Sequence, residues 1–381
     1  MVMGWCYFRT MHKYTLKQKD GLARLGSFET PHGTFDTPNF MPVGTRASVK
    51  GLDCERIAEV GSQVVLVNTY HLWLRPGPEL INELGGIHKF MSWDGPILSD
   101  SGGFQVFSLS KMRKIKEEGV HFQSHIDGKK LLLTPEKAIN IQETLGVDIA
   151  MALDECPPSG LTEKQTEESL ELTLRWAKRS VESRNRAETA IFGITQGGIF
   201  PDLRLRAAQE LSEMPFDGYA VGGVSVGESK ELIKEVVSYN PEQLPADKIR
   251  YLMGVGTPED IVHAVKHGVD LFDCVMPTRS GRFGRAFLIR GDEPYYNLKN
   301  ARFSKDTNPI DSECGCVACR NYSRAYIHHL IHRDEMLGPQ LLSAHNLSQY
   351  LDLMKEIRSS IKDGSFQQVH DRVVGLWSLQ D

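Results

Sequence analysis

Six short apolar runs in the sequence each stop at a polar or glycine residue that could bind a ligand. Carboxylates can accept hydrogen bonds, side-chain amides can donate or accept them, and glycines let backbone amides approach a flat ligand closely. Together these groups could hold a nucleobase. The six stops are Asn68, Asp100, Asp154, Gln196, Gly222–Gly223 and Asp273.

The apolar runs predict the strands that must position these groups. A continuous apolar run of about four to eight residues is typical of a strand buried on both faces. Helical periodicity recurs between the runs, as in residues 162–184, and alternating strands and helices predict a parallel sheet. Because the loops of a (β/α)₈ (TIM) barrel converge at the C-terminal strand ends, we predict this α/β architecture. The predicted strands are residues 64–67, 96–99, 149–153, 191–195, 219–221 and 269–272.

Each polar stop, taken singly, has a simpler interpretation. An Asp or Gln after an apolar run is often a turn former or the N-cap of the next helix. Six such stops in register favour the functional interpretation.

The charge of the chain is distributed unevenly. The net charge is −5, so the whole surface is not one for binding polyanions, but residues 279–305 carry seven basic residues against Asp292 and Glu293. This local excess predicts a phosphate-binding stripe. A second basic cluster, residues 111–116, is equally typical of a solvated face. The basic residues of the stripe are Arg279, Arg282, Arg285, Arg290, Lys299, Arg302 and Lys305.

Several classes of protein are disfavoured by missing signals. No segment approaches the roughly eighteen apolar residues that a membrane span needs, and the first residues lack the pattern of a secretory signal, so we expect a cytoplasmic protein. The glycine-rich stretches 100–105 and 221–228 match neither nucleotide-binding loop pattern, which argues against a nucleotide cofactor.

Three of the seven cysteines are crowded together as Cys314, Cys316 and Cys319. In a reducing compartment this density predicts a zinc site, which is structural if a fourth ligand closes the tetrahedron. The fourth ligand candidates are His328, His329, His332 and His345, and spacing alone leaves them open. The expected helices here begin near Tyr322 and span residues 344–361. The other cysteines are Cys6, Cys54, Cys156 and Cys274, most simply small buried residues, although Cys156 could line the pocket near Asp154.

Length supports one large domain with an appendage. The chain has 381 residues with 40% hydrophobic content, and a barrel typically needs about 250 residues. We expect a loose extension at residues 1–10, with Met11 as an alternative start, and the barrel at residues 11–300. A zinc-binding subdomain and closing helices then occupy residues 301–381.

Seven motifs carry a resemblance to the tRNA-guanine transglycosylases of the bacterial type, in order and from about Met11 to the C-terminus. The resemblance implies a barrel with a zinc-bearing insertion near the C-terminal end and His345 as the fourth ligand of one structural zinc. It also implies a homodimer that exchanges guanine at the tRNA wobble position for a free 7-deazaguanine, in queuosine biosynthesis. The motifs are residues 40–45, 68–72, 75–78, 100–105, 251–256, 272–279 and 314–319.

The chemistry of base exchange agrees with this resemblance. The C1′–N9 bond must break and form again while the ribose is held, which a carboxylate nucleophile achieves through a covalent intermediate. A second carboxylate must protonate the departing purine and deprotonate the incoming one. The resemblance implies that Asp273 is the nucleophile and Asp100 the acid/base.

A guanine pocket needs an acceptor for N1–H and N2–H₂ and donors for O6. Asp154 can accept, while Gln196 and the Gly223 N–H can donate. Phe104 and Met253 could sandwich the ring, or could be ordinary packing at a barrel rim. The remaining predicted base contacts are Ser101, Gly102, Gly103, Cys156, Gly222 and Val226. The predicted tRNA contacts are Gly254, Val255, Gly256, Thr257, Pro258, Glu259, Asp260, Thr278, Arg279, Ser280, Gly281 and Arg282.

Two questions stay open at this level. Val226 and Cys156 resemble the bacterial pattern, whereas Phe283 resembles the eukaryotic catalytic subunit, so we rank 7-aminomethyl-7-deazaguanine first and queuine second as the incoming base. The alternative functions are a non-catalytic tRNA-binding subunit, which should lack one of the paired carboxylates, and a base-releasing RNA glycosidase. A small zinc-dependent module would leave the first three hundred residues unexplained.

Overall fold

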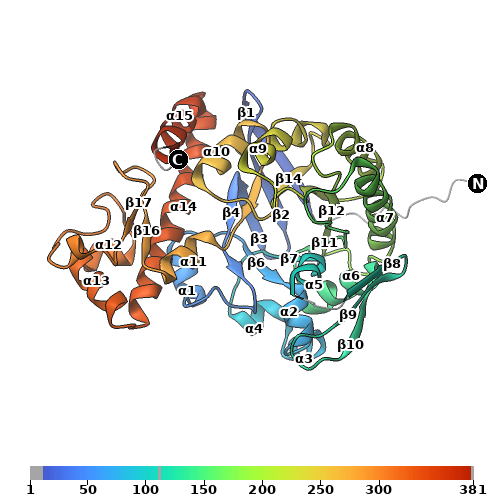
Figure 1. The fold of residues 1–381 in the computed structure, drawn as a ribbon, viewed down its shortest axis with the longest axis horizontal. Helices are drawn as coiled ribbons and strands as arrows, with labels where there is room; N and C mark the ends of the chain where they lie inside the picture. Colours follow the sequence, from blue (N-terminus) through green and yellow to red (C-terminus); the bar gives the residue numbers. More distant parts are fainter. Residues whose placement is uncertain (1–11, 110–112, 379–381) are drawn as a thin grey trace, which may run out of the picture.

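A parallel sheet of nine strands curls around the centre of the computed structural model and confirms the predicted barrel (Figure 1). β4 and β5 are separated only by Pro42, whose carbonyl accepts a hydrogen bond from Leu66 N at 3.0 Å. They are two segments of one interrupted strand. Counted in this way, the nine strands form a barrel of eight strands. In sheet order the strands are β4 (Asn39–Met41), β15 (Leu271–Asp273), β14 (Ile249–Leu252), β13 (Gly218–Val221), β12 (Ala190–Thr195), β11 (Ile149–Met151), β7 (Ile97–Asp100), β6 (Val65–Asn68) and β5 (Val43–Gly44).

All six predicted strands are present. The other two strands of the barrel are β14 and the interrupted strand β4–β5. The structure describes residues 12–109 and 113–378, so the expected extension at residues 1–10, the alternative start Met11 and Cys6 lie outside the described residues. Residues 111 and 112 of the second basic cluster also lie outside them.

Helices follow most of the strands and cover the outside of the barrel (Figure 1). The helix predicted at residues 162–184 is α7, where Thr162 and Gln165 form a capping box and Leu170 and Trp176 pack inward. The helices of the barrel are α1 (Cys54–Glu59), α2 (Thr69–Leu74), α3 (Pro78–Glu83), α4 (Gly86–Met91), α5 (Gly103–Leu109), α6 (Pro135–Leu145), α7 (Glu163–Glu182), α8 (Pro201–Ser212), α9 (Lys230–Tyr239) and α10 (Pro258–Lys266), with a 3₁₀ turn at Pro241–Gln243. None of the helices in the described residues is long and apolar enough to cross a membrane.

An antiparallel sheet closes the N-terminal end of the barrel. It consists of β1 (Lys13–Asp20), β2 (Ala23–Thr30) and β3 (Gly33–Thr37). Phe28 and Phe35 of this sheet join Phe192 and other inward side chains in the core inside the barrel. A second antiparallel sheet, β8 (Arg113–Lys116), β9 (Gly119–Gln123) and β10 (Lys130–Leu133), stands between α5 and α6. The N-terminal end is therefore plugged, and access to the barrel is left to the opposite rim.

The C-terminal part forms a subdomain with its own core. Ala286, Leu298 and Ile327 belong to this core together with the three clustered cysteines. α14 runs between the subdomain and the barrel (Figure 1) and packs against both. The helix expected at residues 344–361 begins earlier, at Leu337, and the one expected near Tyr322 begins at Arg324 after the N-cap Ser323. The elements are α11 (Met276–Arg282), β16 (Arg285–Phe287), β17 (Tyr295–Asn297), a 3₁₀ turn (Ala301–Phe303), α12 (Val317–Asn321), α13 (Arg324–His332), α14 (Leu337–Asp363) and α15 (Phe366–Trp377).

Candidate active site

Asp100 lies at the C-terminal end of β7, beside the end of β6. Its carboxylate accepts hydrogen bonds from the Asn68 side-chain amide and from the backbone N–H of Thr69, the latter at 3.0 Å. Burial raises the pKa of Asp100 to about 7; the Thr69 hydrogen bond opposes this shift, and the charge of Asp273 adds to it. A carboxyl group with this pKa can both donate and accept a proton at neutral pH.

Asp273 lies at the end of β15 on the same rim. Tyr251 Oη donates to its Oδ1 at 2.6 Å, and Gly254 N donates to the same oxygen at 2.8 Å. Among the described residues no hydrogen bond ends on Oδ2, so this oxygen is the one available to a ligand. Burial raises the pKa of Asp273, while the bonds from Tyr251 and Gly254 lower it. The rim therefore carries two half-buried carboxylates, and none of the described cationic side chains pairs with either of them.

Asp154, Gln196 and Gly223 come together on the ends of β11, β12 and β13. Gln196 Nε2 donates to Asp154 Oδ2 at 2.7 Å, and burial raises the pKa of Asp154 to about 6. A Cβ atom on Gly223 would lie 2.1 Å from Gln196 Oε1, so only glycine fits there, and its φ of +62° also favours glycine. Gly222 is equally restricted, because its Cβ would lie 2.5 Å from Ile194 Cγ2.

The other predicted base contacts border this group. Ser101 is buried and its Oγ accepts from Gly103 N, which opens α5. A Cβ on Gly103 would lie 3.2 Å from the Asp154 carbonyl, so α5 packs against the Asp154 loop. Gly102 has a φ of +82°. Phe104 is 44% exposed, which is more than ordinary packing at the rim predicts.

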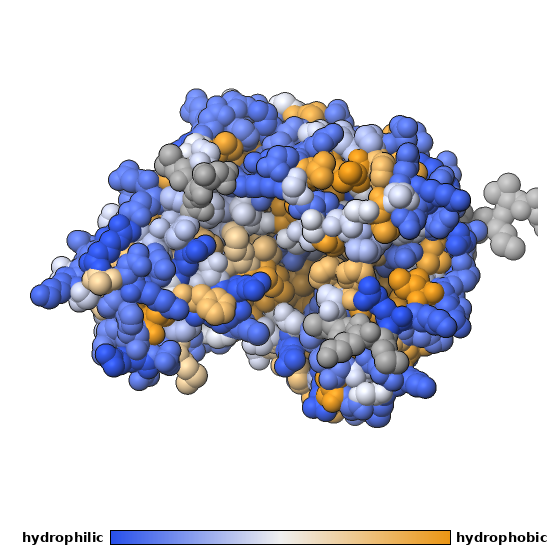
Figure 2. All heavy atoms as spheres, in the orientation of Figure 1, coloured by the Kyte–Doolittle hydropathy of each residue, from blue (hydrophilic) through white to orange (hydrophobic). Residues whose placement is uncertain are grey.

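Cys156, Val226 and Met253 lie at the sides of the site. Cys156 borders a small cavity together with Gly103 and Asp154. Burial raises the pKa of its thiol, so it is neutral. Val226 N donates to Glu228 Oε2 at 2.8 Å, and Met253 packs against the core inside the barrel. In Figure 2 the middle of the visible face, between α11 and α5, is hollowed and apolar with hydrophilic atoms around it.

Sequence reasoning missed two side chains that hold this site. Tyr251 donates a hydrogen bond to Asp273 from β14, which is not one of the six strands predicted from apolar runs. The apolar residues Leu252 and Met253 after Tyr251 were the signal that could have indicated this strand. Glu228 fixes Val226 through a loop contact, for which we see no sequence signal.

The predicted tRNA segment 254–260 is largely committed to the fold. Val255, Pro258 and Glu259 are buried, and Glu259 pairs with Lys230 and with Lys234. Thr257 caps α10 by accepting from Asp260 N at 3.2 Å, and the Gly256 carbonyl accepts from Tyr350 Oη at 2.7 Å. In this loop, backbone groups are therefore more available for contacts with tRNA than the side chains are.

The second predicted tRNA segment, residues 278–282, has one exposed cation next to the site. Arg279 is exposed, Ser280 and Arg282 are half-buried, and Thr278 is buried. Gly281 lets α11 approach α14, because a Cβ there would lie 2.8 Å from Ser343 N.

Some of the basic residues in the predicted phosphate-binding stripe pair with neighbouring side chains, so the stripe is not a continuous surface of unpaired cations. Arg290 pairs with Glu356 at 3.0 Å and Arg302 with Glu293 at 2.8 Å, so two of its cations are neutralised locally. Arg285 lies over the Tyr295 ring at 4.0 Å.

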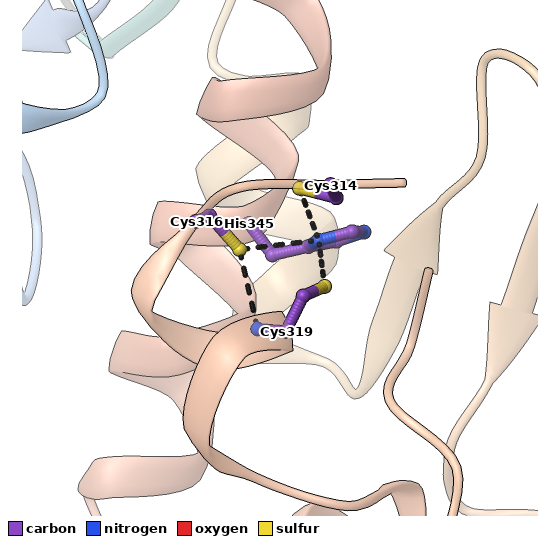
Figure 3. Close-up of side chains that lie close together, drawn as sticks. All are labelled: Cys314, Cys316, Cys319 and His345. Carbon is purple, nitrogen blue, oxygen red and sulfur yellow. Dashed lines mark hydrogen bonds between the residues drawn. The ribbon is translucent and has the colours of Figure 1, made fainter. Parts of the chain in front are cut away.

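Four buried side chains form a ligand cluster in the subdomain (Figure 3). His345 Nδ1 lies 3.7, 3.6 and 3.3 Å from the sulfurs of Cys314, Cys316 and Cys319. A tetrahedral zinc ion with ordinary bond lengths separates sulfur and nitrogen ligands by about 3.6 Å. His345 Nε2 lies 2.8 Å from the Phe287 carbonyl, which leaves Nδ1 for a metal.

The contacts of the four candidate histidines identify the fourth ligand, which the spacing in the sequence left open. His328 Nδ1 and His332 Nε2 instead contact the carbonyls of Leu298 and Lys299. His329 is not part of the cluster. Of the four candidates, His345 alone lies among the cysteines.

The chain matches known proteins over nearly its full length. The family model described as queuine tRNA-ribosyltransferase matches residues 19–378. A protein named queuine tRNA-ribosyltransferase from Listeria innocua is 54% identical over 342 residues, covering 90% of this chain and 89% of the relative. Proteins of that name from Desulforamulus reducens and Pelotomaculum thermopropionicum are 53% and 51% identical, covering 92% and 94% of this chain and 94% and 96% of the relatives. The chain therefore belongs to the queuine tRNA-ribosyltransferase family.

Proposed function

We propose that this protein exchanges guanine in tRNA for a 7-deazaguanine, in queuosine biosynthesis, through a covalent bond between Asp273 and the ribose. Family membership gives the reaction class. The observation that carries the mechanism is the pair of half-buried carboxylates on one rim, which no cationic side chain of the described residues pairs with, together with Asp273 Oδ2, which is left without a hydrogen bond from those residues.

In the first half of the reaction, Asp273 Oδ2 attacks C1′ as the C1′–N9 bond breaks. The electron pair of that bond leaves with guanine, and Asp100, in its acid form, supplies the proton that neutralises the departing base. Tyr251 and Gly254 hold the Asp273 carboxylate through Oδ1 and stabilise its ionised form before attack.

In the second half, the incoming base gives its N9 proton to Asp100. Its N9 then attacks C1′, the bond to Asp273 breaks, and the electron pair returns to the carboxylate. Asp100 is thereby protonated again for the next cycle, so no external acid or base is consumed.

The base pocket accounts for the choice of purine. Ionised Asp154 accepts from N1–H and N2–H₂, while Gln196 and the Gly223 N–H face O6. Gln196 Nε2 carries two hydrogens, and its hydrogen bond to Asp154 uses only one of them. We rank 7-aminomethyl-7-deazaguanine before queuine as the incoming base, since Val226 and Cys156 resemble the bacterial pattern and Cys156 borders the small cavity beside Asp154.

The anticodon loop is bound beside Asp273. Backbone groups of residues 254–260 and the side chains of residues 278–282 are the proposed contacts, with Arg279 placed to meet a flanking phosphate. The target base leaves its stack to enter the pocket, which a single-stranded loop allows at small cost.

The Cys314, Cys316, Cys319 and His345 cluster is the proposed site of one structural zinc ion. A closed four-ligand site cross-links the subdomain and α14 and contributes to folding, with no part in base exchange. Metal analysis of the purified protein should give about one zinc per chain, and Cys316→Ala should lose that metal and melt earlier. A variant that kept both its zinc and its melting temperature would contradict the site.

A homodimer is part of the proposal on family grounds. Sedimentation of the free protein and of its tRNA complex checks it, and a monomer under both conditions would contradict it.

The central test is capture of the covalent intermediate. Wild-type protein is incubated with tRNA and guanine, quenched in denaturant and digested, and the adduct is mapped by mass spectrometry. We expect a ribose–Asp273 ester in the wild type and none in Asp273→Ala, which should still bind tRNA. An adduct on another residue, or exchange by Asp273→Ala, would contradict the mechanism. Without any acceptor base, release of labelled guanine in large excess over the enzyme would identify a hydrolase instead, because the proposed mechanism releases at most one guanine per active site.

A further inference from the structure

Arg204 is a buried cation placed directly behind the base pocket. It belongs to α8 and its side chain is 0% exposed. None of the described carboxylates forms an ion pair with it, which is unusual for a buried guanidinium. Burial lowers the pKa of Arg204 to about 10, so it stays charged at neutral pH. Its charge must therefore be stabilised mainly by the dipoles that it contacts rather than by a directly paired carboxylate.

Four backbone carbonyls provide that stabilisation, and they belong to the two loops that form the pocket. Nε donates to the Gly198 carbonyl at 2.8 Å, and Nη1 donates to the carbonyls of Thr195 at 3.2 Å and Gly222 at 2.8 Å. Nη2 donates to the Gly223 carbonyl at 3.2 Å. One guanidinium thus joins the loop after β12 to the loop after β13.

These bonds fix which way the pocket amides point. In a trans peptide the C=O and the following N–H point in opposite directions. Because the Gly222 carbonyl is held by Arg204, the N–H of Gly223 must point away from Arg204. The Gly222 N–H is held as well, by the Thr195 carbonyl at 3.1 Å.

Gln196 is placed by the same arrangement. Its Oε1 lies 2.1 Å from the position that a Cβ of Gly223 would take, and its Nε2 donates to Asp154. The contacts therefore run from Arg204 to the Gly222–Gly223 backbone, then to the Gln196 amide, then to the Asp154 carboxylate. A shift of the glycine loop would disturb every group that we assign to the base.

We propose that Arg204 is a positioning residue for base recognition, which holds the Gly223 N–H and the Gln196 amide in the orientation that reads O6 of the purine. The inference rests on the proposed function, because it assigns the pocket to a guanine-type base. Arg204 itself does not touch the base.

Arg204→Lys and Arg204→Met test this role, with Arg250→Met as the matched control. Lysine keeps the charge but offers donors from one atom only, so it cannot span both loops. Arg250 is also a buried arginine bound to a carbonyl, that of Leu244, but it lies at the start of β14, at the opposite end of the barrel. The measurements are the melting temperature, kcat, and the KM for tRNA and for free guanine.

We expect both Arg204 variants to raise the KM for guanine about tenfold or more, as loss of one charged hydrogen-bond network predicts, while the KM for tRNA changes less than about twofold. The preference for guanine over 2-aminopurine, which lacks O6, should fall in the same proportion. Arg250→Met should lower the melting temperature without changing that preference.

A merely structural Arg204 gives a different result. If Arg204→Lys lowers the melting temperature but keeps the wild-type KM for guanine and the wild-type base preference, the inference is wrong. Should Arg204→Met not fold, Arg204→Lys decides alone. A wild-type protein that exchanges no base contradicts the proposed function instead, so the two failures are distinguishable.

Discussion

The two ends of the barrel hold aspartates in opposite environments, half-buried at the C-terminal rim and buried at the N-terminal end. At the C-terminal rim the carboxylates meet amides, hydroxyls and backbone N–H groups, with no cationic side chain paired to them among the described residues. At the N-terminal end each carboxylate meets a cation or histidine as well as a backbone donor. The rim residues are Asp100, Asp154 and Asp273, and those at the N-terminal end are Asp148, Asp217 and Asp270.

The aspartates at the N-terminal end follow one pattern. Each stands one residue before a strand and accepts from a backbone N–H at the start of the neighbouring strand, at 2.8 to 2.9 Å. Asp217 pairs with Arg184 and Asp270 with Arg24, and Asp148 accepts from two stacked histidines. Although burial opposes it, the hydrogen bonds from the histidines hold the pKa of Asp148 below its usual value.

The difference teaches how one residue type serves two purposes in one fold. A carboxylate whose charge is matched by a cation ties strands together, and it has little capacity left for a ligand. A desolvated carboxylate without a paired cation keeps its proton to higher pH, as Asp100 and Asp273 do, and Asp273 also keeps one oxygen without a hydrogen bond from the described residues. Pairing is incomplete at Asp270, where burial raises the pKa to about 6 despite Arg24.

The sharpest test exchanges one side chain at each end. Asp273→Asn should lower exchange by about 10⁴-fold or more, because it removes the nucleophile. Asp270→Asn, three residues earlier and just before the same strand, should keep kcat within about tenfold per folded molecule, since only structural contacts are lost. Single-turnover exchange with folded fractions from circular dichroism measures both. A folded Asp270→Asn protein as inactive as Asp273→Asn would break the comparison.

The second test removes a structural carboxylate. Asp217→Ala leaves the Arg184 guanidinium and the Ile191 N–H without their partner, and we expect a loss of about 3–5 kcal/mol in unfolding free energy. Urea denaturation measures it, with Asp202→Ala, an exposed position on α8, as a control within about 1 kcal/mol of wild type. Equal losses in the two variants would show that Asp217 is not a structural anchor.

The sequence predicts the rim better than the opposite end. Apolar runs that stop at Asp100, Asp154 and Asp273 show both the strand and its reactive tip, since the polar residue follows the run directly. The partners of Asp148, Asp217 and Asp270 come from positions as distant as His32, Arg184 and Arg24, and no local pattern joins them. Tyr251 and Arg204 were missed for the same reason, because their roles depend on contacts between separate strands and loops.

Ionisation should affect stability with opposite sign at the two ends. The folded-state pKa of Asp100, about 7, exceeds the unfolded value of 3.8, so the native state binds the extra proton and the free energy of unfolding falls as pH rises towards 7. Asp100→Asn should therefore stabilise the protein, by roughly 2–3 kcal/mol more at pH 8 than at pH 5. Asp148 has a lowered pKa, so its contribution is present at neutral pH and is lost on acidification.

Urea unfolding of Asp100→Asn and Asp148→Asn at pH 5 and pH 8 measures these opposite effects. Asp148→Asn should destabilise the protein at both values, because its unfolded pKa lies below them. An Asp100→Asn variant less stable than wild type at pH 8 would show that the contacts of the ionised Asp100 carboxylate offset the free-energy cost of its burial.

The smallest expected effect concerns the rate of the first half-reaction. Asp100 must carry its proton when guanine departs, so the rate of adduct formation should fall by up to about tenfold per pH unit above pH 7. Release of the adduct to an incoming base needs the ionised form and should rise over the same range. Rapid-quench measurements of the two steps separate them, and Asp270→Asn should keep both profiles. If the rates of adduct formation and adduct release both rose or both fell with pH, Asp100 could not be the group that passes the proton between the two bases.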